Sequence, residues 1–156
     1  MNRSEKRLFL IQALLKERPE YRDLSIPAEP ESQRQLLRGL MNIRAPRHTD
    51  GAFLKTQDEY LQGETAAKGI TDIAGLTSIQ PGLYLWQGDI TTLKCDAIVN
   101  AANSGMTGCY CPNHRCIDNA IHTFAGVELR LACEELMEQQ GYPEPTGQAK
   151  SRWLCP

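Results

Sequence analysis

The spacing of the apolar residues changes at Ile79, and this change limits the possible folds more than any other feature of the sequence. Before it, apolar residues recur every three or four positions, which predicts amphipathic helices over residues 4–17 and 30–42. A weaker helical pattern follows over residues 54–70, where Gly63 is expected to interrupt the helix. The chain therefore begins with a helical segment that ends at this change.

The second part of the sequence combines short apolar runs with one long helical pattern. Residues 82–89 and 95–103 are apolar runs that end in glycine or small polar residues, which predicts two buried strands. From Ile117 to Met137 apolar residues follow helical spacing, and Gly141 then ends the run, which predicts one long helix. Strand, loop, strand, loop and helix is the beginning of an α/β domain, in which ligands bind beyond the carboxyl ends of the strands.

Composition excludes several classes of protein. The formal net charge of -2 gives no reason to expect a nucleic-acid or membrane partner, and no apolar run approaches the roughly 18 to 20 residues of a membrane span. The N-terminus lacks the features of a signal peptide, so the expected location is cytoplasmic. In a reducing compartment, the clustering of three of the six cysteines in one loop favours metal binding or catalysis over a disulfide scaffold.

That cluster lies in residues 103–122, which hold three of the six cysteines and two of the three histidines. Cys109, Cys111, His114 and Cys116 fall within eight positions, so their side chains can converge on one ion. Zinc takes thiolate and imidazole ligands, and three protein ligands with one open position are typical of a catalytic site. The spacing is not that of a common zinc finger, and Cys111 can also be a small loop residue.

Other polar residues stand where a nucleotide could bind. A helix that begins near residues 116–118 presents free N–H groups and a positive dipole end, which favour a phosphate. Asp89 stands at the end of the first apolar run, and Asn100 and Asn103 stand at the end of the second, where they could bind a base and a ribose. Each of these three can instead be a turn or cap residue, and His122 can be a satisfied core histidine.

Longer motifs resemble a known family. The stretch "QGDITTLKCDAIVNAANSGM", followed by "CIDNAIHTFAG", resembles the macrodomains, whose members bind ADP-ribose. The stretch "GCYCPNHRCIDNAIHTFAGVELR" is similar to the zinc-dependent macrodomains, which carry a helical N-terminal extension and remove ADP-ribose from modified proteins. The resemblance implies an α/β fold of the macrodomain-like three-layer α/β/α type, incomplete here. It places the helical extension at residues 1–75, the first half of a macrodomain at 76–150 and a tail outside the family pattern at 151–156.

The resemblance also implies roles for single residues. Asp89 would accept a hydrogen bond from the adenine amino group, and Ile90 would add a backbone contact beside it. Asn103 would hold the distal ribose as a catalytic residue. Asp118 would be a second catalytic residue that positions water or substrate.

For the metal, the resemblance implies Zn²⁺ as the cofactor, with Cys109, His114 and Cys116 as its ligands and Cys111 as a neighbour. The implied function is zinc-dependent hydrolysis that removes mono-ADP-ribose from protein side chains. The expected partners are a mono-ADP-ribosylated protein and ADP-ribose. The alternatives are a non-catalytic ADP-ribose-binding module, in which zinc only shapes the loop, and an inactive fragment.

Overall fold

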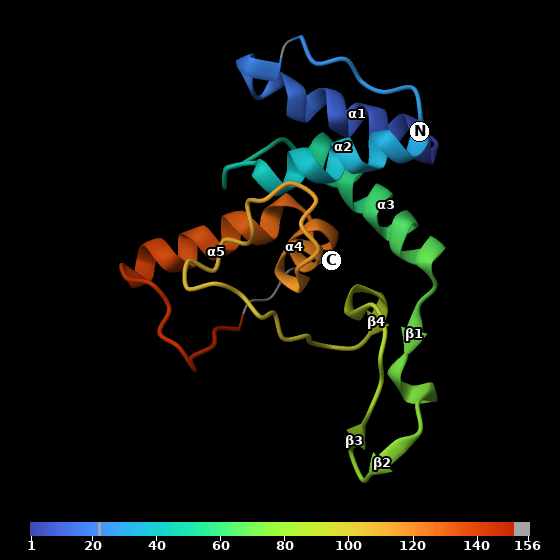
Figure 1. Cartoon of the computed structure of the whole chain (residues 1–156), viewed down its shortest axis with the longest axis vertical. Helices are drawn as coiled ribbons and strands as arrows, with labels where there is room; N and C mark the ends of the chain where they lie inside the picture. The colour runs from blue at the N-terminus through green and yellow to red at the C-terminus, as the bar shows by residue number, and fades with distance from the viewer. Residues whose placement is uncertain (22, 152–156) are drawn as a thin grey trace.

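Helices form in the N-terminal part of the chain where the apolar spacing predicts them. The computed structural model describes residues 1–21 and 23–151. Helices α1 (Arg3–Lys16), α2 (Pro30–Ile43) and α3 (Gly51–Lys68) follow one another, and α1 packs against both α2 and α3 (Figure 1). The predictions of helices over 4–17, 30–42 and 54–70 are confirmed.

The ends of α3 follow from its sequence. The Asp50 side chain accepts a hydrogen bond from the Phe53 N–H and so caps the first turn, and Gly69 with φ of 90° ends the helix. The predicted interruption at Gly63 is wrong. The carbonyl of Gly63 accepts a hydrogen bond from Arg3 at 3.0 Å, and α3 continues through this glycine for another turn.

The main hydrophobic core lies among the three N-terminal helices. Its buried residues come from α1, α2 and α3, with one residue from a later helix: Leu10, Ile11, Leu14, Leu37, Leu40, Met41, Phe53, Tyr60, Leu61 and Val127. Burial of such side chains contributes roughly 1.5 to 3 kcal/mol each relative to exposure. The helical segment is therefore the best-packed part of the described chain.

The strands are short and form two separate sheets. Strand β1 (Thr71–Asp72) pairs in parallel with β4 (Leu93–Lys94), and β2 (Ser78–Gln80) pairs antiparallel with β3 (Leu83–Tyr84). The β2–β3 hairpin projects away from the helices (Figure 1). Three 3₁₀ helices complete the order of elements: η1 (Pro19–Tyr21), η2 (Ile73–Gly75) and η3 (Ile90–Thr92).

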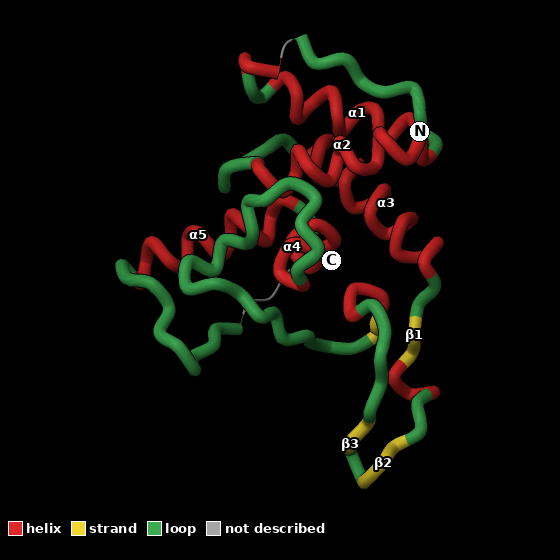
Figure 2. Tube along the Cα trace, in the orientation of Figure 1, coloured by secondary structure: helices red, strands yellow, loops and turns green. Residues whose placement is uncertain are grey.

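Both predicted buried strands are corrected by the structure. Of residues 82–89, only Leu83–Tyr84 forms a strand, and residues 95–103 form none. Leu85 is 81% exposed and Val99 is 85% exposed, so these apolar side chains contact solvent instead of a sheet interior. A strand needs a neighbour for its N–H and C=O groups, and within the described residues these runs lack one of matching length. Figure 2 shows loop from β4 onward to the next helix.

The predicted single helix over 117–137 is two helices. Helix α4 (Ile117–Phe124) ends at Ala125, and α5 (Val127–Gln140) begins after Gly126. Gly126 has φ of 81°, which L side chains rarely adopt, and the buried Gln57 side chain accepts a hydrogen bond from the Val127 N–H at 2.9 Å. The chain therefore turns at Gly126, which places α5 against the end of α2 (Figure 1).

The fold as a whole is mixed α/β, as predicted, with an incomplete sheet. None of the helices in residues 1–21 and 23–151 combines the length and apolar character that crossing a membrane requires. The residues from 152 onward, which include Cys155 and most of the predicted tail at 151–156, lie outside the described part of the chain.

Candidate metal centre and nucleotide site

The three predicted metal ligands come together in the loop before α4. One ligand atom from each of Cys109, His114 and Cys116 lies within 4.8 Å of the others. The Cys109 Sγ and His114 Nδ1 atoms are 3.6 Å apart. Tetrahedral zinc, with bonds of about 2.3 Å to sulfur and 2.0–2.1 Å to nitrogen, separates such a pair by about 3.6 Å. Two thiols and one imidazole at this spacing fit zinc, which leaves room for one further ligand.

A turn within the loop brings these side chains together. The His114 N–H donates to the Cys111 carbonyl at 3.2 Å, and Asn113 between them has φ of 56° in the left-handed region. Asparagine tolerates this conformation better than most residues. The Cys111 side chain is exposed and lies outside the ligand group, so the structure separates it from Cys109 and Cys116.

Cys116 also caps α4. Its Sγ atom accepts a hydrogen bond from the Asn119 N–H at 3.4 Å, and α4 begins at the next residue. The positive end of the helix dipole favours negative charge at such a position. The position of the sulfur is therefore set by the first turn of the helix.

Asp118 is buried in the first turn of α4. Its Oδ1 atom accepts a hydrogen bond from Asn100 Nδ2 at 2.7 Å and lies 3.5 Å from His122 Nε2. Burial lowers the pKa of His122, which the charge of Arg130 lowers further and Asp118 partly restores. His122 is buried, as expected of a core histidine, but no described residue hydrogen-bonds to its ring nitrogens or to Asn100 Oδ1.

Both side-chain polar atoms of Asn103 hydrogen-bond within the loop. Its Nδ2 atom donates to the Gly108 carbonyl at 3.2 Å, and its Oδ1 atom accepts from the Gly105 N–H at 2.9 Å. The side chain therefore stabilises the loop on the N-terminal side of Cys109. Its use by a ribose remains a prediction.

Asp89 caps η3 at the end of α3. The carboxylate accepts from Thr91 N at 3.0 Å and Thr91 Oγ1 at 2.6 Å, and Lys68 Nζ donates to it at 2.8 Å. Burial raises the pKa of Asp89, but the hydrogen bonds from Lys68 and Thr91 outweigh burial and hold this pKa below its ordinary value. The same ammonium group lies 3.4 Å from the centre of the Phe124 ring. The carboxylate that was predicted to bind adenine therefore already accepts a hydrogen bond from Lys68 of the same chain.

A long groove joins these parts of the chain. It measures about 1090 Å³ and runs between residues 90–106, α4, α5 and residues 144–151. Ile90 and Thr91 line one part, and Asn100 and Asn103 line another. Its volume is at the upper end of the roughly 300–1,000 Å³ typical of ligand pockets. The three metal-ligand residues are not among its lining, so the groove and the ligand group are neighbouring features.

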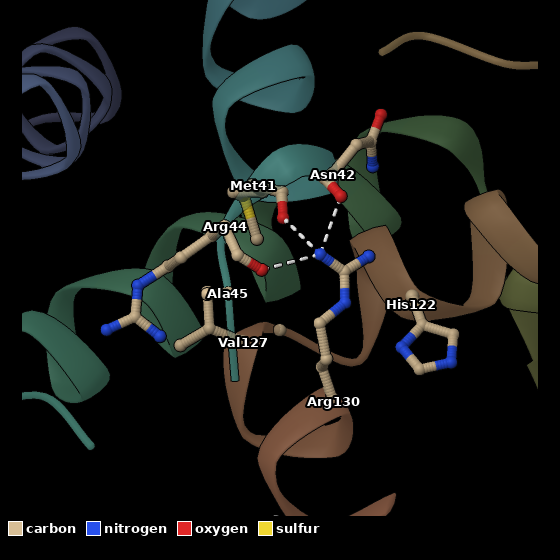
Figure 3. A pocket seen from close by; sticks show the side chains of 8 residues that line it. Met41, Asn42, Arg44, Ala45, His122, Val127 and Arg130 are labelled. Atoms are coloured by element: carbon tan, nitrogen blue, oxygen red, sulfur yellow. Dashed lines mark hydrogen bonds between the residues drawn. The ribbon is translucent and has the colours of Figure 1, made fainter. Parts of the chain in front are cut away.

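Residues from the helical segment support the site, and sequence reasoning missed them. Arg38 and Asn42 of α2 hydrogen-bond to the loop and to α4, and Arg130 of α5 hydrogen-bonds to the end of α2 (Figure 3). Arg38 and Asn42 stand four positions apart on the polar side of a predicted amphipathic helix. Two polar residues at this spacing are the feature of the sequence that could have indicated a contact. They did not indicate the partners, which lie 71 to 81 positions later in the chain.

Comparison with known proteins gives matches over most of the chain. Residues 99–152 match the Macro domain family. The chain is 54% identical over 154 residues to "Protein-ADP-ribose hydrolase" of Treponema medium, which covers 96% of this chain and 59% of that protein. It is 45% identical over 143 residues to "Protein-ADP-ribose hydrolase" of Staphylococcus aureus (strain MRSA252), covering 91% of this chain and 53% of that protein.

A third relative matches a shorter stretch. The chain is 55% identical over 60 residues to a "Probable bifunctional ADP-ribose hydrolase/ADP-ribosyltransferase" of Fusarium oxysporum f. sp. cubense, which covers 38% of this chain and 10% of that protein. The chain spans between half and three fifths of the length of the two hydrolase-named bacterial relatives. The Macro domain match agrees with the predicted macrodomain-like fold in incomplete form.

Proposed function

We propose that this chain serves zinc-dependent hydrolysis of mono-ADP-ribose from modified protein side chains. The observation that carries the proposal is the convergence of Cys109, His114 and Cys116 within 4.8 Å, a donor set that fits zinc with one position open. The names of two relatives, which share 54% and 45% of the aligned residues, support the ADP-ribose part of the proposal. A mono-ADP-ribosylated protein would be the substrate, and water would release ADP-ribose from it.

The three ligand residues would hold the ion in the loop before α4. A bound zinc supplies a Lewis acid that polarises a substrate oxygen or lowers the pKa of water toward about 7. Asp118 is buried in the first turn of α4, where it accepts a hydrogen bond from the groove-lining Asn100 at 2.7 Å, and it would orient substrate or water. Asn103 would contribute to the distal ribose by fixing the loop beside it through its bonds to Gly105 and Gly108.

The opposite end of the ligand would lie near η3. Asp89 would accept a hydrogen bond from the adenine amino group, with Ile90 beside it, once Lys68 gives up its contact with the carboxylate. The groove that Ile90 shares with Asn100 and Asn103 supports this placement, because one extended ligand could reach all three.

Zinc content and ADP-ribose release test the proposal together. His114→Ala removes one of three protein ligands, so purified variant protein is expected to lose stoichiometric zinc and zinc-dependent release. The matched control is Cys111→Ser, an exposed loop thiol outside the ligand group, which is expected to keep both. Full zinc occupancy in His114→Ala would refute the ligand assignment. ADP-ribose binding without any release would favour a non-catalytic binding module.

A further inference from the structure

Helix α2 contacts the metal-ligand loop directly, although it precedes the loop by some 70 residues. Arg38 of α2 donates from Nη2 to the backbone carbonyl of His114 at 3.0 Å. Hydrogen bonds from a guanidinium are charge-assisted and stronger than neutral ones. The backbone of a candidate ligand is therefore fixed by a residue of the helical segment.

The same guanidinium reaches the other end of the loop through Asn119. Arg38 Nε and Nη2 donate to Asn119 Oδ1 at 3.2 and 2.8 Å. Asn119 is fully buried, and its Nδ2 donates to the Cys111 carbonyl at 3.1 Å while its backbone N–H donates to Cys116 Sγ. Arg38 and Asn119 together thus connect Cys111, His114 and Cys116.

Two neighbours of Arg38 on α2 fix the remaining part of the loop. Asn42 Oδ1 accepts a hydrogen bond from the Asn113 N–H at 3.0 Å. A Cβ atom on Gly39 would lie 3.3 Å from Asn113 Nδ2 and 3.7 Å from Pro112, so a glycine lets the loop approach the helix closely. One side of α2 therefore acts as the surface on which the loop is folded.

We infer that Arg38 is a positioning residue of the metal centre, because it holds His114 and, through Asn119, Cys116 in one arrangement. The inference rests on the proposed metal centre. Partners of this kind in metalloproteins typically change metal affinity by 10- to 100-fold when they are mutated. The helical segment is on this view a structural part of the metal site.

Zinc affinity of the full 156-residue chain, measured by competition with a chromophoric chelator, tests this inference. Arg38→Met is expected to weaken zinc binding by about 10- to 100-fold. The control is Arg34→Met, one turn earlier on the same helix, where the exposed side chain bonds to Glu31 and, among the described residues, to no part of the metal-ligand loop. Arg34→Met is expected to leave zinc affinity unchanged.

The variant Arg38→Lys separates the effect of the positive charge from the effect of the hydrogen-bond geometry. This variant keeps the positive charge but lacks the planar fork that bonds to His114 and Asn119 at once, so it is expected to bind zinc nearly as weakly as Arg38→Met. Cobalt substituted for zinc gives a second readout, because its visible absorption reports the arrangement of the two thiolates and the imidazole. The absorption maxima are expected to move in both variants of Arg38 and to stay in Arg34→Met.

The outcomes distinguish this inference from the proposed function. A wild-type chain that binds no zinc would refute the metal centre itself. Zinc affinity and cobalt spectra of Arg38→Met or Arg38→Lys equal to those of a zinc-binding wild type would overturn only the role of Arg38. Thermal unfolding of the metal-free proteins shows whether each variant is folded, and a folded Arg38→Lys with wild-type affinity is sufficient to refute the inference.

Discussion

Replacing Arg130 by methionine should strongly destabilise the fold. Arg130 lies on α5, is 4% exposed, and extends toward the end of α2 (Figure 3). Its Nη1 donates to the carbonyls of Met41, Asn42 and Arg44 at 3.3, 2.5 and 2.7 Å, and its Nε donates to the Thr107 carbonyl at 2.8 Å. Methionine replaces the aliphatic stem of arginine, but it is shorter and has no hydrogen-bond donor.

The magnitude follows from the acceptors that lose their donor. A buried carbonyl left without a partner costs about 1–3 kcal/mol, and here Asn42, Arg44 and Thr107 are affected most, since Met41 still accepts from the Arg44 N–H. The buried guanidinium has no carboxylate among its hydrogen-bond partners, so methionine also removes a desolvation cost that partly offsets the loss. The adjoining cavity of about 10 Å³ admits at most one water. The expected net loss is about 3–5 kcal/mol in the free energy of unfolding.

Urea denaturation measures this loss by linear extrapolation to water. The matched control is Arg47→Met, whose partly exposed side chain forms an ion pair with Glu17. The loss of stability in this variant should stay below about 1 kcal/mol. Because domains of this size are stable by roughly 5–15 kcal/mol, the effect of Arg130→Met should be obvious. A loss for Arg130→Met no larger than that of the control would refute the reasoning.

Three further changes have defined outcomes. Gly126→Ala places an alanine at a backbone φ of 81°, where its Cβ would clash with Gln57 Nε2. The free energy of unfolding should therefore fall by about 2–4 kcal/mol. An unchanged urea midpoint would contradict this. Lys68→Met removes the ammonium group that bonds to the Asp89 carboxylate, so calorimetry should show tighter ADP-ribose binding. Weaker binding would indicate that Lys68 itself contacts ADP-ribose. Burial holds the pKa of His122 below the ordinary 6.5, so the unfolded chain binds a proton at a higher pH than the folded chain does. The free energy of unfolding should therefore fall as the pH drops through 6.5, by at most about 1.4 kcal/mol per pH unit. In urea titrations at several pH values, His122→Gln should reduce this slope.

The parts of the fold that depend on local sequence could be predicted. Helices α1 to α3 carry their own apolar stripes and bury them against each other, so spacing alone located them. The strands could not be predicted in the same way. Residues 95–103 have the composition of a strand, but a strand exists only where another strand accepts its hydrogen bonds, and the described residues offer none beside this run.

The site shows the same division between local and distant information. Cys109, His114 and Cys116 fall within eight residues, so one turn brings them together and the cluster is visible in the sequence. Arg38 and Asn119 are 81 positions apart, and their contact depends on how α2 packs beside α4. The break at Gly126 was missed because the spacing continues across it, and only the contact with Gln57 fixes the turn.

The two ends of the proposed site are held by different parts of the chain, which predicts that their contributions to ADP-ribose binding are independent. The metal ligands are fixed by α2 and α4, whereas Asp89 is fixed by Lys68 at the end of α3. Within the described residues no hydrogen bond joins the two groups, although the Lys68 ammonium also lies on the Phe124 ring of α4. Loss of a charge-assisted bond in Asp89→Ala should weaken ADP-ribose binding by roughly 1.5–3 kcal/mol. Removing zinc should weaken it separately, and for sites without shared partners such losses add within about 0.5 kcal/mol. Calorimetry of wild type and Asp89→Ala, each with zinc and after chelation, gives the interaction free energy. A value above about 1 kcal/mol would show that zinc binding reorganises the η3 end, and that the two ends form one cooperative unit.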